Sequence, residues 1–527
     1  MVSMASRASL DQSNVPTSSK TRVDGVVPFI ELRPDADQPM FEQLYSAIRE
    51  YIVHGRLAPA TRLASSRVLA IELGVSRFTV VAALDQLRAE GYIASSRRSG
   101  TFVAASLPDR AIVARSRGAV REKKPPAKSP SQGSLGLSSR GRALSSIVIS
   151  GPRYDAGEPR AFRPRRPPLD IFPFALWGRL VRRQWTTFRH SMLDYGEPAG
   201  LRGLREAIAA HAATTRGVRC DADQVIVTAG AQQAFNILFQ LLLDPGDEAW
   251  IEEPGYLDVR GALTAHGATL VPVPVDEHGM DVEAGMAMAP TAKLVYVSPS
   301  HQYPTGATLS AERRWKLLDW ARHRGAWIVE DDYDSYFRYR GRPLPALQSL
   351  DAEQRTSSNA SSRVAYVGTF SKTMFPSLRL GYCIVPTELA DAVANARAVA
   401  DRNSSIVDQA ALEIFIREGH YDRHLRRVRS ACLERHDALR ASIKRHLAGA
   451  VSLSAMNAGT HALGWLARGL PSPTQVEMRA QDDGLVVFPL SRYCLSRPRR
   501  DAMVLGYGGL TPRLIDAGVR RLAAYLR

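Results

Sequence analysis

Cysteine is scarce in this chain. Its 527 residues include four cysteines, Cys220, Cys383, Cys432 and Cys494, which lie far apart and form no Cys-x-x-Cys pair. This distribution argues against a disulfide framework and against a zinc site. We therefore expect a reducing, cytoplasmic environment and no bound metal.

Long apolar runs are also missing. The longest uncharged stretch, from Gln224 to Leu243, is interrupted by Gly230 and by four amide side chains, so it predicts a buried strand followed by a helix rather than a bilayer span. The first 25 residues are rich in serine and lack the apolar centre of a secretory signal.

Acidic residues are too few to balance the basic ones. Lys and Arg number 69 against 52 Asp and Glu, a net charge of +17. Such an excess implies an anionic partner, with nucleic acid ahead of a membrane surface. Hydrophobic residues at 45% suffice for large cores, and the length predicts two or three folded units.

Composition divides the chain into four parts. Residues 1–27 are polar and expected to be disordered. A small helical module spans residues 28–105, and residues 106–152 form a flexible linker with nine basic and two acidic residues. That linker is either a solvated spacer or a segment attracted to DNA phosphates. In residues 153–527 strands alternate with helices, which predicts an α/β fold with a mostly parallel sheet.

Three helices are predicted in the small module. Apolar residues recur at helical spacing from Met40 to Tyr51. A second helix follows the capping hydroxyls of Ser65 and Ser66 and ends at Gly74. A third follows Ser76, with a predicted packed side of Val80, Val81, Leu84 and Leu87. Two helices joined by a tight glycine turn form a helix-turn-helix.

A wing follows the third helix. Two short strands, Gly91-Tyr92-Ile93 and Thr101-Phe102-Val103, are joined by a basic turn, which completes a winged helix. The alternative is a small protein-interaction module, but basic and hydroxyl side chains gather on one predicted surface. The residues expected to contact DNA are Arg67, Ser76, Arg77, Thr79, Arg97, Arg98, Gly100 and Thr101.

Residues Pro39 to Val103 resemble the GntR group of bacterial regulators. The resemblance is carried by Pro-x-x-x-Gln-Leu-x-x-x-Ile-Arg, by Ser-Ser-Arg-x-Leu-Ala-x-x-Leu-Gly-Val-Ser-Arg-x-Thr-Val, and by Ala-Glu-Gly-Tyr-Ile and Ser-Gly-Thr-Phe-Val. Ala60 and Ala64 depart from it, because the group usually has Gly and Pro there. We expect these departures to alter turn stability rather than DNA contact.

Four segments carry the chemistry of the large block. A strand running from Trp327 ends in the acids of Glu-Asp-Asp-Tyr, and another from Val364 ends in Thr-Phe-Ser-Lys. Because α/β sheets place ligands at the carboxyl ends of their strands, a carboxylate and a lysine should meet there. The strand from Val225 leads through small residues into a helix whose amides suit a phosphate. Glu253-Pro254-Gly255-Tyr256 offers an aromatic that stacks on a flat ring.

A phosphate cradle, a stacking aromatic, a carboxylate for a ring nitrogen and a lysine together describe a pyridoxal 5'-phosphate (PLP) site. From about Leu169 onward the chain is similar to the fold type I aminotransferases, which add a smaller C-terminal α/β subdomain. This resemblance implies that Lys372 forms the Schiff base, Asp331 pairs with the pyridine nitrogen, Tyr333 lies near the phenolic oxygen and Tyr256 stacks on the ring. It also implies a phosphate cup made by Gly230, Ala231, Gln232, Thr369 and Arg379, completed by Tyr195 from a second subunit of a homodimer.

Two positions depart from those enzymes. Tyr303 stands before Pro-Thr-Gly where they usually carry Asn, so one hydrogen bond to the ring is lost or replaced. Val504 stands where they hold a substrate carboxylate with Arg; Arg492, Arg497 or Arg513 are possible substitutes. We therefore expect at most slow half-transamination of common amino acids.

A GntR-like winged helix, a basic linker and an aminotransferase-like domain resemble the MocR/GabR regulators. The resemblance implies a PLP-dependent transcription regulator that binds an operator in double-stranded DNA and senses an amino compound or PLP itself. The alternative is a working aminotransferase that carries a DNA-binding domain.

Overall fold

The computed structural model describes residues 25–28, 30, 32–33, 38–96, 100–105, 136–145, 147, 161–187, 194–341, 344–355, 361–455, 457–480, 483–498 and 500–526. The chain divides into two units, Met1–Gln132 and Gly133–Arg527, so the division falls within the segment predicted to be a linker. In the described part of the chain, no helix is long and apolar enough to cross a bilayer.

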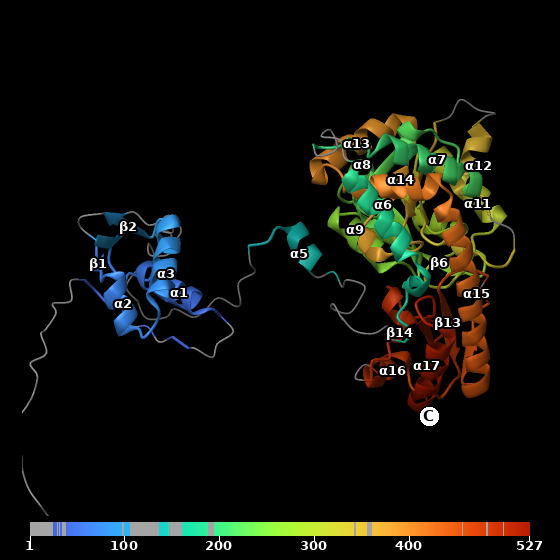
Figure 1. Cartoon of the computed structure of the whole chain (residues 1–527). Coiled ribbons are helices and arrows are strands. Elements are labelled where there is room, and N and C mark those ends of the chain that lie inside the picture. The colour runs from blue at the N-terminus through green and yellow to red at the C-terminus, as the bar shows by residue number, and fades with distance from the viewer. Residues whose placement is uncertain are drawn as a thin grey trace, which may run out of the picture. The chain divides into compact units, whose positions relative to one another are not determined.

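The first unit is a winged helix (Figure 1). Its elements are α1 (Met40–Val53), β1 (Arg62–Leu63), α2 (Ser66–Glu72), α3 (Arg77–Ala89), β2 (Ile93–Ser96) and β3 (Gly100–Val103). The three strands form one antiparallel sheet in the order β1-β3-β2, and the short strand β1 was not predicted.

Apolar side chains from all three helices close the core of this unit. Leu44 and Ile48 of α1 pack with Leu69 of α2 and Val80 of α3. The Ser65 hydroxyl caps α2 and the Ser76 hydroxyl caps α3, by accepting hydrogen bonds from backbone N–H groups three residues on. The predicted packed side of α3 was wrong at one residue: Val81 is 37% exposed, and Ala83 takes the buried position instead.

The second unit contains an eight-stranded sheet in the order β4-β11-β10-β9-β8-β5-β6-β7. The strands from β10 to β6 are parallel, whereas β11 and β7 are antiparallel to their neighbours. The strands are β4 (Val225–Thr228), β5 (Glu248–Glu253), β6 (Thr269–Asp276), β7 (Gly279–Met280), β8 (Leu294–Val297), β9 (Trp327–Asp332), β10 (Val364–Thr369) and β11 (Gly381–Ile384).

Helices cover both faces of this sheet because its strands are apolar on both sides. On one face, side chains such as Val329 and Val367 pack against α8 (Ala231–Leu242), α9 (Leu257–Ala265) and α13 (Thr387–Asp401). On the other, Ile328 and Tyr366 pack against α6 (Phe174–Thr186), α7 (Arg202–Arg216), α10 (Val282–Met288), α11 (Ala311–Arg324), α12 (Leu347–Arg355) and α14 (Ile406–Arg417).

A smaller subdomain ends the chain (Figure 1). Four antiparallel strands in the order β12-β13-β15-β14 pack with the long helix α15 (His420–His446) and with α16 (Pro473–Ala480) and α17 (Pro512–Tyr525). The strands are β12 (Val451–Leu453), β13 (His461–Leu466), β14 (Phe488–Pro489) and β15 (Ala502–Gly506).

One further helix lies within the segment predicted to be a linker. Helix α5 (Ser139–Ser145) contacts α9 of the second unit. Beyond it, Ile147 lies against Gly261, close enough that a β-carbon on that glycine would come within 3.0 Å of Ile147 Cγ2.

Candidate functional site

Two neighbouring strands bring the predicted carboxylate and lysine together. β9 and β10 are parallel, with Asp331 beside Val367, so both strands end at the same edge of the sheet. Asp331 and Lys372 line one cavity of about 530 Å³. The next acid along, Asp332, points elsewhere and accepts hydrogen bonds from Arg216 and Tyr366.

The same cavity collects most of the residues predicted to hold PLP. Those that line it are Ala231, Gln232, Tyr256, Asp331, Tyr333, Thr369, Lys372 and Arg379. Gly230 is the N-cap of α8, directly before the lining residue Ala231, and is not itself among the lining residues. Tyr195 is 76% exposed and is not among the lining residues; its contribution to the site of a second subunit stays a prediction.

An anion cup lies at the start of α8. Gly230 has a φ of +93°, and the helix begins at Ala231 with backbone N–H groups that have no partner within the helix. A β-carbon on Gly230 would come within 3.2 Å of Arg379 Nη2 and would push the guanidinium back by a few tenths of an ångström. Arg379 Nη2 donates to Ala229 O at 2.6 Å. Amides and a guanidinium at one point suit a phosphate group.

Asp331 has one oxygen without a partner. Its Oδ2 accepts a hydrogen bond from the Tyr296 hydroxyl at 2.5 Å, whereas its buried Oδ1 has no hydrogen-bond partner in the described part of the chain. Burial raises the pKa of this carboxyl to about 7. A protonated pyridine nitrogen would satisfy the free oxygen and stabilise the charge, so the site fits PLP.

Lys372 is held as a reactive amine. Burial, followed by the charge of Arg165, lowers its pKa to about 7. Its Nζ donates to the backbone oxygen of Arg165 at 3.1 Å. A lysine with this pKa is about half neutral at pH 7, and its neutral form can attack a carbonyl.

A buried polar chain lies behind Tyr333. His301 Nδ1 lies 3.1 Å from the Tyr333 hydroxyl and 2.7 Å from Asp334 Oδ2. Sequence reasoning missed His301 and Asp334, although both flank motifs that it quoted. Tyr303, which replaces the usual Asn, is buried and donates its hydroxyl hydrogen to Tyr493 at 3.0 Å.

The position of the missing carboxylate clamp is apolar in the fold. Val504 on β15 is fully buried between β13 and β14. None of the three suggested substitutes, Arg492, Arg497 and Arg513, lines the cavity. Arg492 instead donates to Glu477 Oε1 at 2.6 Å. The arginine present there besides Arg379 is Arg165, which no sequence motif indicated.

The winged helix exposes part of its predicted DNA surface. Arg67 and Arg77 are exposed at the starts of α2 and α3. The Ser76 hydroxyl caps α3 through Thr79 N and also lies 2.7 Å from Thr79 Oγ1, so both hydroxyls have structural partners. Phe78, which the sequence analysis did not select, is 83% exposed.

The wing is described only at its ends. Arg97 and Arg98 lie outside the described residues. Gly100 has a φ of +101°, which explains a glycine there. The Thr101 hydroxyl lies 3.0 Å from that of Ser95 across the two strands. The contacts of all these residues with DNA stay predictions.

Comparison with known proteins matches both units. Residues 41–103 match the family of bacterial regulatory proteins of the gntR type, and residues 184–461 match aminotransferase class I and II. The chain is 39% identical over 489 residues, which are 93% of this chain and 94% of the relative, to the probable rhizopine catabolism regulatory protein MocR of Rhizobium meliloti. It is 32% identical to the pyridoxine biosynthesis regulator PdxR of Corynebacterium glutamicum, over 91% of this chain and 94% of that protein.

Among solved structures, the second unit is similar to LysN, an alpha-aminoadipate aminotransferase of Thermus thermophilus. The TM-score is 0.64 at 25% identity, covering 74% of this chain and 94% of that one. The fold and cavity therefore define a fold type I aminotransferase domain joined to a GntR-type winged helix. The chain belongs to the MocR-type family of HTH transcriptional regulators.

Proposed function

We propose that this chain is a cytoplasmic, homodimeric transcription regulator that holds PLP on Lys372 and binds an operator in double-stranded DNA through residues 28–105. Its aminotransferase-like domain senses an amino compound or PLP itself, and the linker of residues 106–152 joins it to the winged helix. The observation that carries this proposal is the cavity in which the unpartnered Asp331 oxygen and the Lys372 amine lie together with the anion cup at Gly230.

Each residue of the cavity has one task in this proposal. When bound, PLP supplies an aldehyde and an electron-withdrawing pyridinium ring. Asp331 keeps the ring nitrogen protonated, Tyr256 stacks on the ring and Tyr333 faces the phenolic oxygen. The phosphate is held by Gly230, Ala231, Gln232, Thr369, Arg379 and, from the second subunit, Tyr195.

The first experiment tests the cofactor. Purified chain mixed with PLP should show a visible absorption band, and Lys372→Ala should lose that band while keeping its circular dichroism spectrum. Asp331→Ala should weaken PLP binding, because the pyridinium would lose its matching anion. A band that persists in Lys372→Ala would mean that another lysine holds PLP.

The second candidate function is a working aminotransferase, favoured by the reactive Lys372. Holoprotein incubated with amino acids and a keto acid separates the two, through visible absorbance and keto-acid release. The buried Val504 leads us to expect at most a slow half-reaction. Sustained turnover at about 1 per second or more would establish the enzyme instead.

The third experiment tests DNA binding. A footprint of the holoprotein on the DNA flanking its own gene should show a protected operator. No protection at low salt, with or without PLP, would contradict the regulator.

A further inference from the structure

A second guanidinium enters the cofactor cavity from a loop without regular structure. Arg165 precedes α6, and it lines the cavity together with Lys372 and Asp331. Arg379 already supplies a guanidinium to the anion cup at Gly230, and Arg165 is the second arginine of the cavity.

The backbone at Arg165 is fixed in a conformation that side chains other than glycine rarely adopt. Its φ is +69°, in the left-handed region. The loop is held on both sides: Gly506 N of β15 donates to Phe162 O at 2.9 Å, and Lys372 Nζ donates to Arg165 O. A strained residue that neighbouring contacts hold in place is a candidate for function.

Hydrogen bonds to neighbouring side chains orient the Arg165 guanidinium, but they do not use all of its N–H groups. Its Nη2 donates to the Tyr256 hydroxyl at 2.9 Å and to Asp258 Oδ2 at 3.1 Å, and its Cζ lies 4.7 Å from the centre of the Tyr256 ring. Within the described part of the chain, every hydrogen bond of this guanidinium uses Nη2. Its Nε and Nη1 hydrogens remain for a ligand.

An amino ligand with an acidic group would need a cationic partner in the cavity, away from Lys372. The amino group of a ligand must come to the Lys372 side of the cavity, and Val504 gives its acidic end no partner. A guanidinium matches a carboxylate with two parallel hydrogen bonds. Arg165 presents one inside the cavity, whereas Arg492 is paired with Glu477 outside it.

We propose that Arg165 binds the carboxylate of the effector, so that this regulator selects amines that carry a carboxylate, which are amino acids. This inference rests on the proposed function, in which the cavity holds PLP on Lys372. Tyr256 and Asp258 keep the guanidinium in position before the ligand arrives.

The experiment compares ligands that differ only in the carboxylate. PLP-loaded full-length chain is titrated with ω-amino carboxylates of two to six carbons and with the matching n-alkylamines, and the change of the visible band gives half-saturating concentrations. The wild-type chain should prefer the best amino carboxylate over its matching amine by about tenfold or more. Arg165→Gln should abolish this preference, so that its half-saturating concentrations for the amino carboxylate and for the matching amine lie within about twofold of each other.

Two further variants keep the test decisive. Arg165→Gly relieves the left-handed backbone, which offsets part of the stability lost with the contacts to Tyr256 and Asp258, and it should still lose the preference. Arg492→Gln is the matched control and should keep it. The assignment is wrong if the wild type shows no preference, or if both Arg165 variants retain it.

Two other outcomes distinguish a failure of the Arg165 assignment from a failure of the proposed function. If both Arg165 variants bind PLP more tightly and keep the preference, the guanidinium competes with PLP for space instead of binding the effector, and the assignment is wrong. If the wild-type chain takes up no PLP at all, the proposed function fails and this inference fails with it.

Discussion

Burial gives the acidic side chain of Asp331 and the basic side chain of Lys372 a similar pKa. Removal from water disfavours the charged form of each, so it raises the pKa of the Asp331 carboxyl to about 7 and lowers that of the Lys372 amine to about 7. The protonation of both side chains, and with it the net charge of the cavity, therefore changes with pH near neutrality.

The reactivity of Lys372 should therefore rise with pH through about 7. The neutral amine is the nucleophile, and its fraction grows as pH passes the pKa. We expect the rate of PLP capture by the apo chain to increase from pH 5.5 to 8 with a midpoint near 7, followed by stopped-flow absorbance. In Arg165→Gln the midpoint should move upward, because the guanidinium charge that lowers the lysine pKa is gone. An unmoved midpoint would show that Arg165 does not act on the lysine.

The two departures from the GntR pattern have opposite consequences in the fold. Ala60 has a φ of +63° and is exposed, a conformation that costs an L-residue about 1–2 kcal/mol. Ala64 is buried and donates its backbone N–H to Val26 O at 3.1 Å.

We expect Ala60→Gly to raise the stability of the winged helix by about 1 kcal/mol, because glycine adopts a positive φ without strain. Ala64→Pro should lower it by about 1 kcal/mol, because proline removes the bonded N–H. The measurement is the first transition in calorimetry of the full chain. Equal effects of the two changes would contradict the left-handed turn.

At the scale of elements, the start of α3 is where DNA contact is predicted. Arg77→Ala should weaken operator binding by about 1–3 kcal/mol if the side chain reads a base, or lower the salt dependence by about one unit if it contacts a phosphate. Arg88, at the other end of α3, is paired with Asp85 and serves as the control, since Arg88→Ala should leave binding unchanged. Fluorescence anisotropy at several salt concentrations measures both. Unchanged binding in Arg77→Ala and in Arg67→Ala would contradict the assignment of the recognition helix.

Helix α5 makes part of the predicted linker a wall of the cofactor cavity. Leu144 of α5 and the nearby Ile147 line it. Changing both to Ser should speed PLP release by about fourfold or more, because each apolar CH₂ buried is worth about 0.8 kcal/mol. Leu137, an apolar residue of the same segment that does not line the cavity, gives the control variant Leu137→Ser. Equal release from all three chains, followed by the decay of the visible band, would show that α5 does not close the site.

Local patterns were sufficient for most of these elements. Capping hydroxyls and helical spacing gave the three helices of the winged unit, and apolar strands ending in acids and in a lysine gave the edge where Asp331 and Lys372 meet. Arg165 escaped prediction because its loop has no periodic pattern and lies 207 residues from Lys372 in the chain. The packing of α5 on α9 depends on tertiary contacts that a basic, serine-rich sequence does not reveal.

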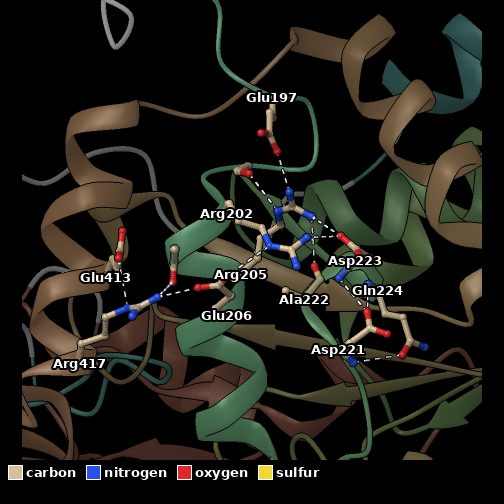
Figure 2. A network of polar contacts seen from close by, with 12 residues as sticks. Glu197, Arg202, Arg205, Glu206, Asp221, Ala222, Asp223, Gln224, Glu413 and Arg417 are labelled. Atoms are coloured by element: carbon tan, nitrogen blue, oxygen red, sulfur yellow. Dashed lines mark hydrogen bonds and ion pairs between the residues drawn. The ribbon is translucent and has the colours of Figure 1, made fainter. Parts of the chain in front are cut away.

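At the scale of the whole molecule, the loop that carries Tyr195 is fixed by a network of charges around α7 (Figure 2). Arg205 is buried and donates to Glu197 Oε2 at 2.6 Å and to Gly200 O at 3.0 Å, and both acceptors lie within five residues of Tyr195 in the chain. On the same helix Arg202 donates to Glu206 at 3.1 Å, and Glu206 in turn accepts from Arg417 of α14 at 2.8 Å. These contacts hold Glu197 and Gly200 of the loop against α7, and the predicted task of the exposed Tyr195 is to reach the site of a second subunit.

This arrangement predicts that two chains share each cofactor site. Tyr195 is outside the cavity of its own chain, with the Arg402 guanidinium 4.8 Å from its ring centre. Tyr195→Phe should weaken PLP binding about tenfold or more, as expected for a hydrogen bond to a charged phosphate.

Mixing two defective chains distinguishes a shared site from a private one. Lys372→Ala chains keep Tyr195 but cannot attach PLP, whereas Tyr195→Phe chains keep the lysine but bind weakly. In a mixed dimer, the lysine of the second chain meets the tyrosine of the first, so one complete site forms and tight PLP binding should return in proportion to the mixed dimers. Titration of the visible band before and after subunit exchange measures this recovery. If Tyr195 served its own chain, or if the chain were monomeric, mixing would restore no tight site.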